Sequence, residues 1–204
     1  MNSLTDLHLD ALAEVFNVGA GRAAASLSEI VGDEVKLSVP SVEIKKTSEV
    51  DANIMDLSSL KFGVVSQQFS GPFDAQALLL FTESHALEIV RDMMGSQMSI
   101  EELAEFEQEA MCELGNIILN ACLSAMADML HISLNSSLPD YKIASTEEIF
   151  RSLHSAEDQA FVLVLHIDLS IEKRLSEGHL IFLLSSMSLL SLVKHLEQFL
   201  GNIE

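Results

Sequence analysis

Two copies of one polar pattern stand at a constant offset of 99 residues in this chain. The pattern consists of an acidic residue, a glutamate, an asparagine and a distant proline: Asp10, Glu14, Asn17 and Pro40, then Glu109, Glu113, Asn116 and Pro139. Residues at positions i, i+4 and i+7 of an α-helix lie within about 60° of one another around its axis. Each copy therefore predicts one polar stripe, roughly 10 Å long, on a helix that is otherwise apolar.

The side chains of such a stripe suit the positioning of water and the pairing with a partner's cation. The carboxamides of Asn17 and Asn116 donate and accept hydrogen bonds, but they stay uncharged and are poor nucleophiles. They are suited to orient an attacking water, a task that a glutamine performs in some nucleotide hydrolases. The two glutamates suit ion pairs with a partner's lysine or arginine, and Asp10 and Glu109 lie one turn earlier to support them.

The repetition of the stripe favours a function over mere solvation. Acidic residues on a helix surface are usually solvated, and Pro40 and Pro139 could simply end or kink strands. Asparagine, however, is a poor residue for a helix interior, yet it recurs here with the same glutamate and the same distant proline. Folding alone gives no obvious reason for the Glu–Asn pairs.

A glycine-rich stretch within the first predicted helix imitates a dinucleotide-binding fingerprint. Gly19, Gly21 and Ala24 have its spacing, but the fingerprint requires a preceding strand and a helix start, whereas this stretch lies in the middle of a helix. The close approach of another backbone at Gly19 or Gly21 is the better explanation.

The composition excludes several classes of function. The 204 residues are 49% hydrophobic and carry a formal net charge of −20, so no basic patch can contact nucleic-acid phosphates. No uninterrupted run of 18 apolar residues predicts a membrane span. The N-terminal segment lacks the basic region of a secretory signal, and we expect a cytoplasmic protein.

The cysteines and histidines do not form a metal-ligand pattern. Cys112 and Cys122 are ten residues apart on one predicted helix, so they cannot bond to each other and are predicted to be buried, reduced thiols. The histidines never pair at ligand spacing, so we expect no metal site, and a self-contained metal hydrolase is disfavoured.

Hydrophobic periodicity predicts a helix, strands and a helix in each half of the chain. Capping boxes are predicted at Ser3 with Asp6 and at Ser99 with Glu102, and Gly32 should end the first helix. In the first half we expect a helix to residue 30, strands 34–40 and 42–46, a loop 47–59, a hairpin 61–69 with 74–81, and a helix 83–94. In the second half we expect a helix to residue 130, strands 131–138, 158–169 and 178–184, and a helix 188–200, with 141–154 ambiguous.

These elements predict an internally duplicated α/β domain. The repeats are residues 1–98 and 99–204, related by a pseudo-two-fold axis, with a mostly antiparallel sheet and two long surface helices that carry the stripes. The two halves should form one compact domain, because the sheet of each half needs the other half to cover its apolar face.

The motifs resemble those of a known family. The segments EVFNVGAGRAAASLS (14–28) and ELGNIILNACLSAM (113–126), with both prolines, are similar to the CheC branch of the CheC/CheX/FliY phosphatases of bacterial and archaeal chemotaxis. The family motif is (D/S)-x3-E-x2-N-x22-P, and the resemblance covers essentially the whole chain. The first copy matches every position, whereas Glu109 replaces the family's Asp or Ser in the second.

The resemblance implies a reaction and a partner. Family members hydrolyse the aspartyl phosphate of the response regulator CheY. Their asparagine, here Asn17 and Asn116, orients the attacking water, and their glutamate, here Glu14 and Glu113, pairs with the regulator's lysine. The Mg²⁺ belongs to the regulator, so no cofactor is expected on this chain. Some members also bind the receptor deamidase CheD, which is therefore a candidate partner.

Two points follow from the motif. The alternative function is a non-catalytic docking module, related to flagellar-switch adaptors, that binds the regulator without hydrolysis. Both stripes are predicted to be working sites, and the first is predicted to be the stronger. It matches the motif fully, and Gly19 and Gly21 would leave room for a partner where the second helix has Ile118 and Asn120.

Overall fold

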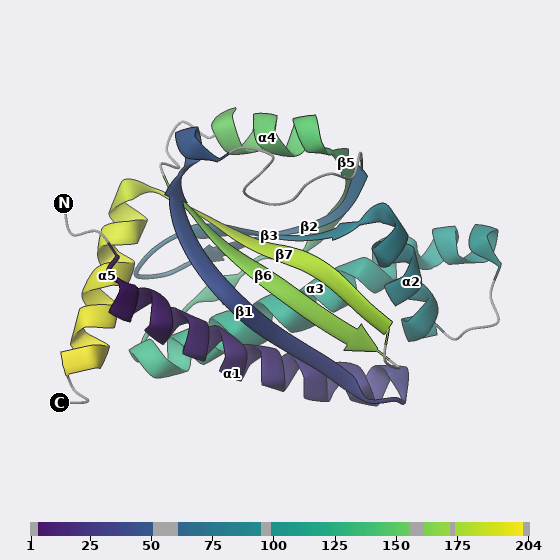
Figure 1. The fold of residues 1–204 in the computed structure, drawn as a ribbon, viewed down its shortest axis with the longest axis horizontal. Helices are drawn as coiled ribbons and strands as arrows, with labels where there is room; N and C mark the ends of the chain where they lie inside the picture. Colours follow the sequence, from purple (N-terminus) through teal and green to yellow (C-terminus); the bar gives the residue numbers. More distant parts are fainter. Residues whose placement is uncertain (1–3, 51–60, 95–98, 156–160, 172–173, 202–204) are drawn as a thin grey trace.

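The computed structural model describes residues 4–50, 61–94, 99–155, 161–171 and 174–201. Within these ranges, one antiparallel sheet is covered by long helices on one face and by a short helix on the other (Figure 1). The predicted α/β class with a mostly antiparallel sheet is confirmed.

The described helices are α1 (Asp6–Val31), the 3-10 helix η1 (Thr47–Glu49), α2 (Glu83–Met94), α3 (Ile100–Leu130), α4 (Thr146–Ser155) and α5 (Ser186–Gly201). Four of them, α1, α2, α3 and α5, agree with the predicted periodicity, whereas η1 and α4 were not predicted as helices. Gly32 ends α1 in the left-handed conformation with φ of 75°, as predicted. In the predicted box at Ser99, the Glu102 carboxylate accepts from the Ser99 N–H at 2.8 Å.

The predicted capping box at Ser3 and Asp6 is wrong. Thr5 is the N-cap of α1, and its hydroxyl accepts from the His8 N–H while His8 Nδ1 accepts from the Thr5 N–H. An imidazole here replaces the usual glutamate or glutamine at this position of the box. Ser3 itself lies outside the described residues.

The strands of the two halves form a single sheet. They are β1 (Val35–Lys46), β2 (Lys61–Ser70), β3 (Ala75–Thr82), β4 (Asn135–Ser136), β5 (Asp140–Ser145), β6 (Phe161–Ile171) and β7 (Arg174–Leu184). Their order is β1-β6-β7-β3-β2-β4, and β5 also pairs with β2. Strands from before and after residue 98 therefore pair with each other at β1–β6, β7–β3 and β2–β4. The repeat boundary itself stays a prediction.

Three segments differ from the predicted strands. The strands predicted at 34–40 and 42–46 are one strand, β1, interrupted by a register shift. The strand predicted at 131–138 is wrong except for β4, because His131 caps α3 with φ of 52° and the chain then turns. The ambiguous segment 141–154 divides into β5 and α4, and part of the loop predicted at 47–59 lies outside the described residues.

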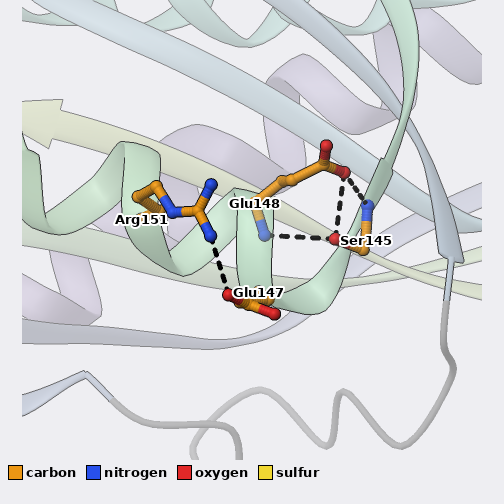
Figure 2. A network of polar contacts seen from close by, with 4 residues as sticks. All are labelled: Ser145, Glu147, Glu148 and Arg151. Atoms are coloured by element: carbon orange, nitrogen blue, oxygen red, sulfur yellow. Dashed lines mark hydrogen bonds and ion pairs between the residues drawn. The ribbon is translucent and has the colours of Figure 1, made fainter.

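The helix α4 covers the second face of the sheet, opposite α1 (Figure 1). Figure 2 shows how its first turn is closed: the Glu148 carboxylate accepts from the N–H and the hydroxyl of Ser145, at 2.7 and 2.9 Å. These two hydrogen bonds hold the pKa of Glu148 below its ordinary value, and the bond from the Ser145 backbone N–H has the larger effect. A depressed pKa means that the cap stabilises α4 at neutral pH and is lost as the pH falls through it.

The helix α3 is the core helix of the fold. By length and hydropathy alone, its residues Glu102–Leu130 could cross a membrane. More than half of its apolar window is buried, however, in the cluster that joins the sheet to α1 and α5. This burial is typical of a helix in a protein core, and it accounts for the apolar composition.

The two long helices touch at Gly19. A Cβ built on Gly19 would lie 2.5 Å from Cys122 Cα and 2.9 Å from the Ala121 carbonyl oxygen. The predicted close approach of another backbone at Gly19 or Gly21 is therefore confirmed, and the residue is Gly19. Gly21 is exposed, with nothing within 4 Å of its built Cβ.

Replacing these two glycines by alanine should have opposite effects. Gly19→Ala forces the α1 and α3 backbones apart and should lower the free energy of unfolding by about 1–3 kcal/mol. Gly21→Ala removes only the helix-destabilising glycine and should raise it by roughly 0.5–1 kcal/mol. Urea unfolding of both variants measures the difference. Equal effects would mean that the helices do not meet at Gly19.

Candidate functional site

The first stripe lies on the outer face of α1, but its amide is turned to the sheet. Asp10, Glu14 and Asn17 are exposed residues. The Val39 N–H donates to Asn17 Oδ1 at 2.9 Å, and Asn17 Nδ2 donates to the Val39 carbonyl at 3.0 Å and to the Ala13 carbonyl at 2.9 Å. The carboxamide thus pairs with both backbone polar groups of one residue of β1, as a neighbouring strand would.

A β-bulge in β1 explains why this pairing is needed. Ser38 pairs with Asp168 and Ser41 with His166, so Val39 and Pro40 together oppose a single residue of β6. Pro40 has no N–H to donate, and Val39 is buried, so its peptide groups require another partner. Asn17 is that partner, which gives the N-x22-P spacing a structural reason that the sequence interpretation missed.

The second stripe lies on α3, and there the bulge is held differently. Ser136 pairs with Phe69 and Asp140 with Ser66, so three residues oppose two. Ser137 closes this bulge itself: its N–H donates to the Gln68 carbonyl at 2.9 Å, and its hydroxyl accepts from the Gln68 N–H at 3.1 Å. Asn116 is therefore not required by the strand.

The residue before the proline points in opposite directions in the two copies. Val39 is 2% exposed and packs under α1, whereas Leu138 at the equivalent position is 89% exposed. The outward turn of Leu138 leaves the space beside α3 open. The same motif therefore builds a closed seam in the first half and an open one in the second.

A groove of about 710 Å³ runs along this open seam. The polar side chains of the second stripe line it, together with Pro139: Glu109, Glu113 and Asn116. Its apolar walls come from the last turn of α1, the end of α2, the start of α3 and the bulge, and include exposed side chains: Ile30, Met94, Phe106 and Leu138. No sequence pattern marks these four residues, because they belong to separate elements.

The Asn116 amide is half-buried in this wall, and one side of it has no partner. Its Oδ1 accepts from Asn120 Nδ2 at 2.6 Å, and its Nδ2 donates no hydrogen bond within the described residues. Glu109 and Glu113 are exposed. The groove thus presents two carboxylates and an amide donor to any molecule that enters it.

Two neighbours complete the wall near Pro139. Cys112 is half-buried with its Sγ 3.8 Å from the Pro139 carbonyl, so the prediction of a buried thiol holds for Cys122 alone. Burial raises the pKa of the Cys112 thiol, and the nearby Asp140 carboxylate raises it further. Burial raises the pKa of the Cys122 thiol to about 12. The Tyr141 hydroxyl donates a hydrogen bond to Glu107 and so links β5 to α3. The pKa of Tyr141 is raised, mainly by burial and secondly by this hydrogen bond.

The described part of the groove contains no cation. Arg22, the basic residue near the first stripe, pairs with Asp128 at 2.8 Å and so links α1 to α3. No group of three His, Cys, Asp or Glu among the described residues could hold a metal ion. A phosphate dianion beside Glu109 and Glu113 would be repelled unless its own carrier supplied the positive charge.

Fold and stripes together define a class: an antiparallel α/β domain in which two long helices each present a Glu-x2-Asn pair. The predicted resemblance to the CheC/CheX/FliY family is confirmed by the comparisons. The family model of the CheC-like family matches residues 7–44. The protein named "CheY-P phosphatase CheC" of Bacillus subtilis is 23% identical over 145 residues, covering 70% of this chain and 69% of that one.

Solved structures share the fold. The crystal structure of Thermotoga maritima FliY superposes with a TM-score of 0.78 at 22% identity, covering 97% of this chain and 100% of that one. The CheX-CheY-BeF3-Mg+2 complex from Borrelia burgdorferi matches with a TM-score of 0.51 at 16% identity, covering 85% of this chain and 97% of that one.

The two asparagines should differ in their contribution to stability. Asn17→Ala leaves the buried peptide of Val39 unpaired and should lower the free energy of unfolding by about 1–3 kcal/mol. Asn116→Ala removes no bond to a strand and gains helix propensity, so the stability should change by less than about 0.5 kcal/mol. Denaturant unfolding of both variants is the measurement. If Asn116→Ala lowered the free energy of unfolding as much as Asn17→Ala does, the conclusion that only Asn17 is required by a strand would be wrong.

Proposed function

We propose that this chain is a phosphatase that hydrolyses the aspartyl phosphate of a CheY-like response regulator at its second stripe. The observation that carries the proposal is the groove in which Glu113 and the Asn116 amide are both accessible. The similarity to a protein named for CheY-P phosphatase activity supports the reaction. The relative solved as a complex with CheY supports the partner.

The charge of the chain supports the division of labour between the two proteins. With a net charge of −20 and carboxylates in the groove, this chain cannot by itself hold the phosphoryl group. The regulator therefore brings the phosphoryl group together with the Mg²⁺ and the lysine that neutralise it. This chain contributes no cofactor of its own.

Asn116 and Glu113 take separate roles in the proposed reaction. The Asn116 amide holds a water molecule in line with the phosphorus, and the water adds as the bond from phosphorus to the aspartyl oxygen breaks. The products are inorganic phosphate and the free regulator carboxylate. Glu113 pairs with the regulator's lysine and fixes the orientation of the complex, with Glu109 supporting it one turn earlier.

The first stripe is proposed to contribute less to catalysis, which reverses the ranking expected from the motif. The motif predicted that Gly19 and Gly21 leave room for a partner. Gly21 is exposed with open space beside it, but Gly19 is buried against Cys122. The Asn17 amide is occupied by Val39 on both of its sides. The alternative function, docking without hydrolysis, therefore fits Asp10 and Glu14 of this stripe. A cytoplasmic location and the binding of a CheD-type deamidase stay predictions.

Single asparagine variants test the proposed function. The protein is mixed with a CheY-type regulator phosphorylated on its aspartate in the presence of Mg²⁺, and the release of phosphate is followed. Asn116→Ala should slow the release by roughly 10²-fold or more, the size of effect expected when a positioning group is lost. Asn17→Ala, assayed where it is folded, should stay within a few-fold of the parent.

Two outcomes of that assay would contradict the proposal. If the parent protein does not accelerate phosphate release at all, the proposed hydrolysis is wrong for both stripes. If Asn17→Ala removes the activity and Asn116→Ala does not, the amide that the structure shows bound to β1 must become free in the complex, and the assignment to the second stripe is wrong.

Leu138 and Glu113 should contribute to binding in different ways. Leu138 is 89% exposed, so Leu138→Ala costs little stability but removes apolar area from the rim of the groove. We expect a several-fold weaker affinity for the regulator that is insensitive to added salt. Glu113→Gln should weaken binding most at low ionic strength, because salt screens exposed charge pairs. Fluorescence titration at two salt concentrations separates the two, and unchanged affinity in both variants would place the interface elsewhere.

A further inference from the structure

The Asn116 amide is contacted by a second asparagine one turn further along α3. Asn120 is half-buried, and its Nδ2 lies 2.8 Å from the Asn116 backbone carbonyl oxygen and 2.6 Å from the Asn116 side chain. The first contact is the ordinary bond of a polar side chain to the preceding turn of its helix. The second contact reaches the side chain that the proposed reaction uses.

We propose that Asn120 is a positioning residue that fixes which way the Asn116 amide faces. The inference rests on the proposed function and deepens it. A backbone carbonyl can only accept, so the Asn120 atom beside it must be the Nδ2 donor. The Asn116 atom that shares this donor must then be an acceptor, which is Oδ1. The Nδ2 of Asn116 therefore occupies the other branch of the amide, and it has no partner in the described residues.

The orientation matters because a carboxamide is nearly symmetric in shape but opposite in polarity at its two ends. Rotation by half a turn would exchange the donor and the acceptor that a water molecule meets in the groove. Asn120 Nδ2 disfavours the exchanged form, in which two N–H donors would face each other. Oδ1 keeps its second lone pair for the water, so the bond to Asn120 orients the amide without occupying it fully.

The first copy of the motif solves the same problem in another way. The residue equivalent to Asn120 at the 99-residue offset is Gly21, which has no side chain to donate. There the Val39 N–H donates to Asn17 Oδ1 and fixes the amide. In that copy, however, Nδ2 is also bound, to Val39 and Ala13. In the second copy, Asn120 thus orients the Asn116 amide, and the described part of the sheet makes no bond to Asn116 Nδ2.

Two substitutions remove the donor without removing Asn116. Asn120→Asp is isosteric and places acceptors opposite Asn116 Oδ1, which favours the exchanged amide. Asn120→Ala removes the contact without adding charge and has a higher helix propensity, so it should fold. Both variants are assayed for release of phosphate from the phosphorylated regulator, over a range of regulator concentrations. Each is also made in the Asn116→Ala protein.

We expect both variants to lower kcat about tenfold or more, with KM for the regulator within about twofold, because orientation of the water and not docking is affected. In the Asn116→Ala background, neither change should slow the reaction further by more than about twofold, since no amide is left to orient. A merely structural role of Asn120 would instead slow the reaction in both backgrounds.

The outcomes separate this inference from the proposed function. If Asn116→Ala is slow and either Asn120 variant retains the parent kcat, the positioning role is overturned while the function stands. An equal slowing in both backgrounds overturns it as well. If Asn116→Ala itself retains the parent rate, the proposed role of the second stripe fails first.

Discussion

The paired hydrogen bonds between the Asn17 carboxamide and the Val39 peptide hold α1 against the edge strand of the sheet. Without them, the bulge at Val39 and Pro40 would bury an unpaired N–H and an unpaired carbonyl on the single residue Val39, which is a large cost in folding free energy. The position of α1 in turn sets the contact of Gly19 with α3 and the stacking of Phe16 on Phe182, whose ring centres are 5.4 Å apart. The seam between helix and bulge is therefore a structural joint in the first half.

The second half keeps the motif, but its asparagine, Asn116, makes no hydrogen bond to the strand within the described residues. Ser137 bonds to the backbone of Gln68 and closes the bulge, so Leu138 turns outward and Asn116 is left to the groove. Two copies of one motif can divide their tasks in this way, because one copy secures the fold while the other lines a surface groove. We interpret the unequal burial of Val39 and Leu138 as the physical sign of that division.

Much of the fold could be predicted from the sequence, because periodicity and caps act locally. The bounds of α2 and the caps at Gly32 and Ser99 were predicted from neighbouring residues alone. The bulges could not be predicted, since a register shift depends on the partner strand. The groove was missed for the same reason: Ile30, Met94 and Leu138 look like ordinary surface residues until the ends of three elements are brought together.

The most direct test of the account observes the two amides themselves. Side-chain amide NMR signals of Asn17 and Asn116 can be recorded before and after a CheY-type regulator activated with beryllofluoride and Mg²⁺ is added. Because Asn17 is bound to Val39 and Asn116 Nδ2 has no described partner, we expect a large shift for Asn116 and an unchanged signal for Asn17. A shift of the Asn17 signal with an unchanged Asn116 signal would contradict it.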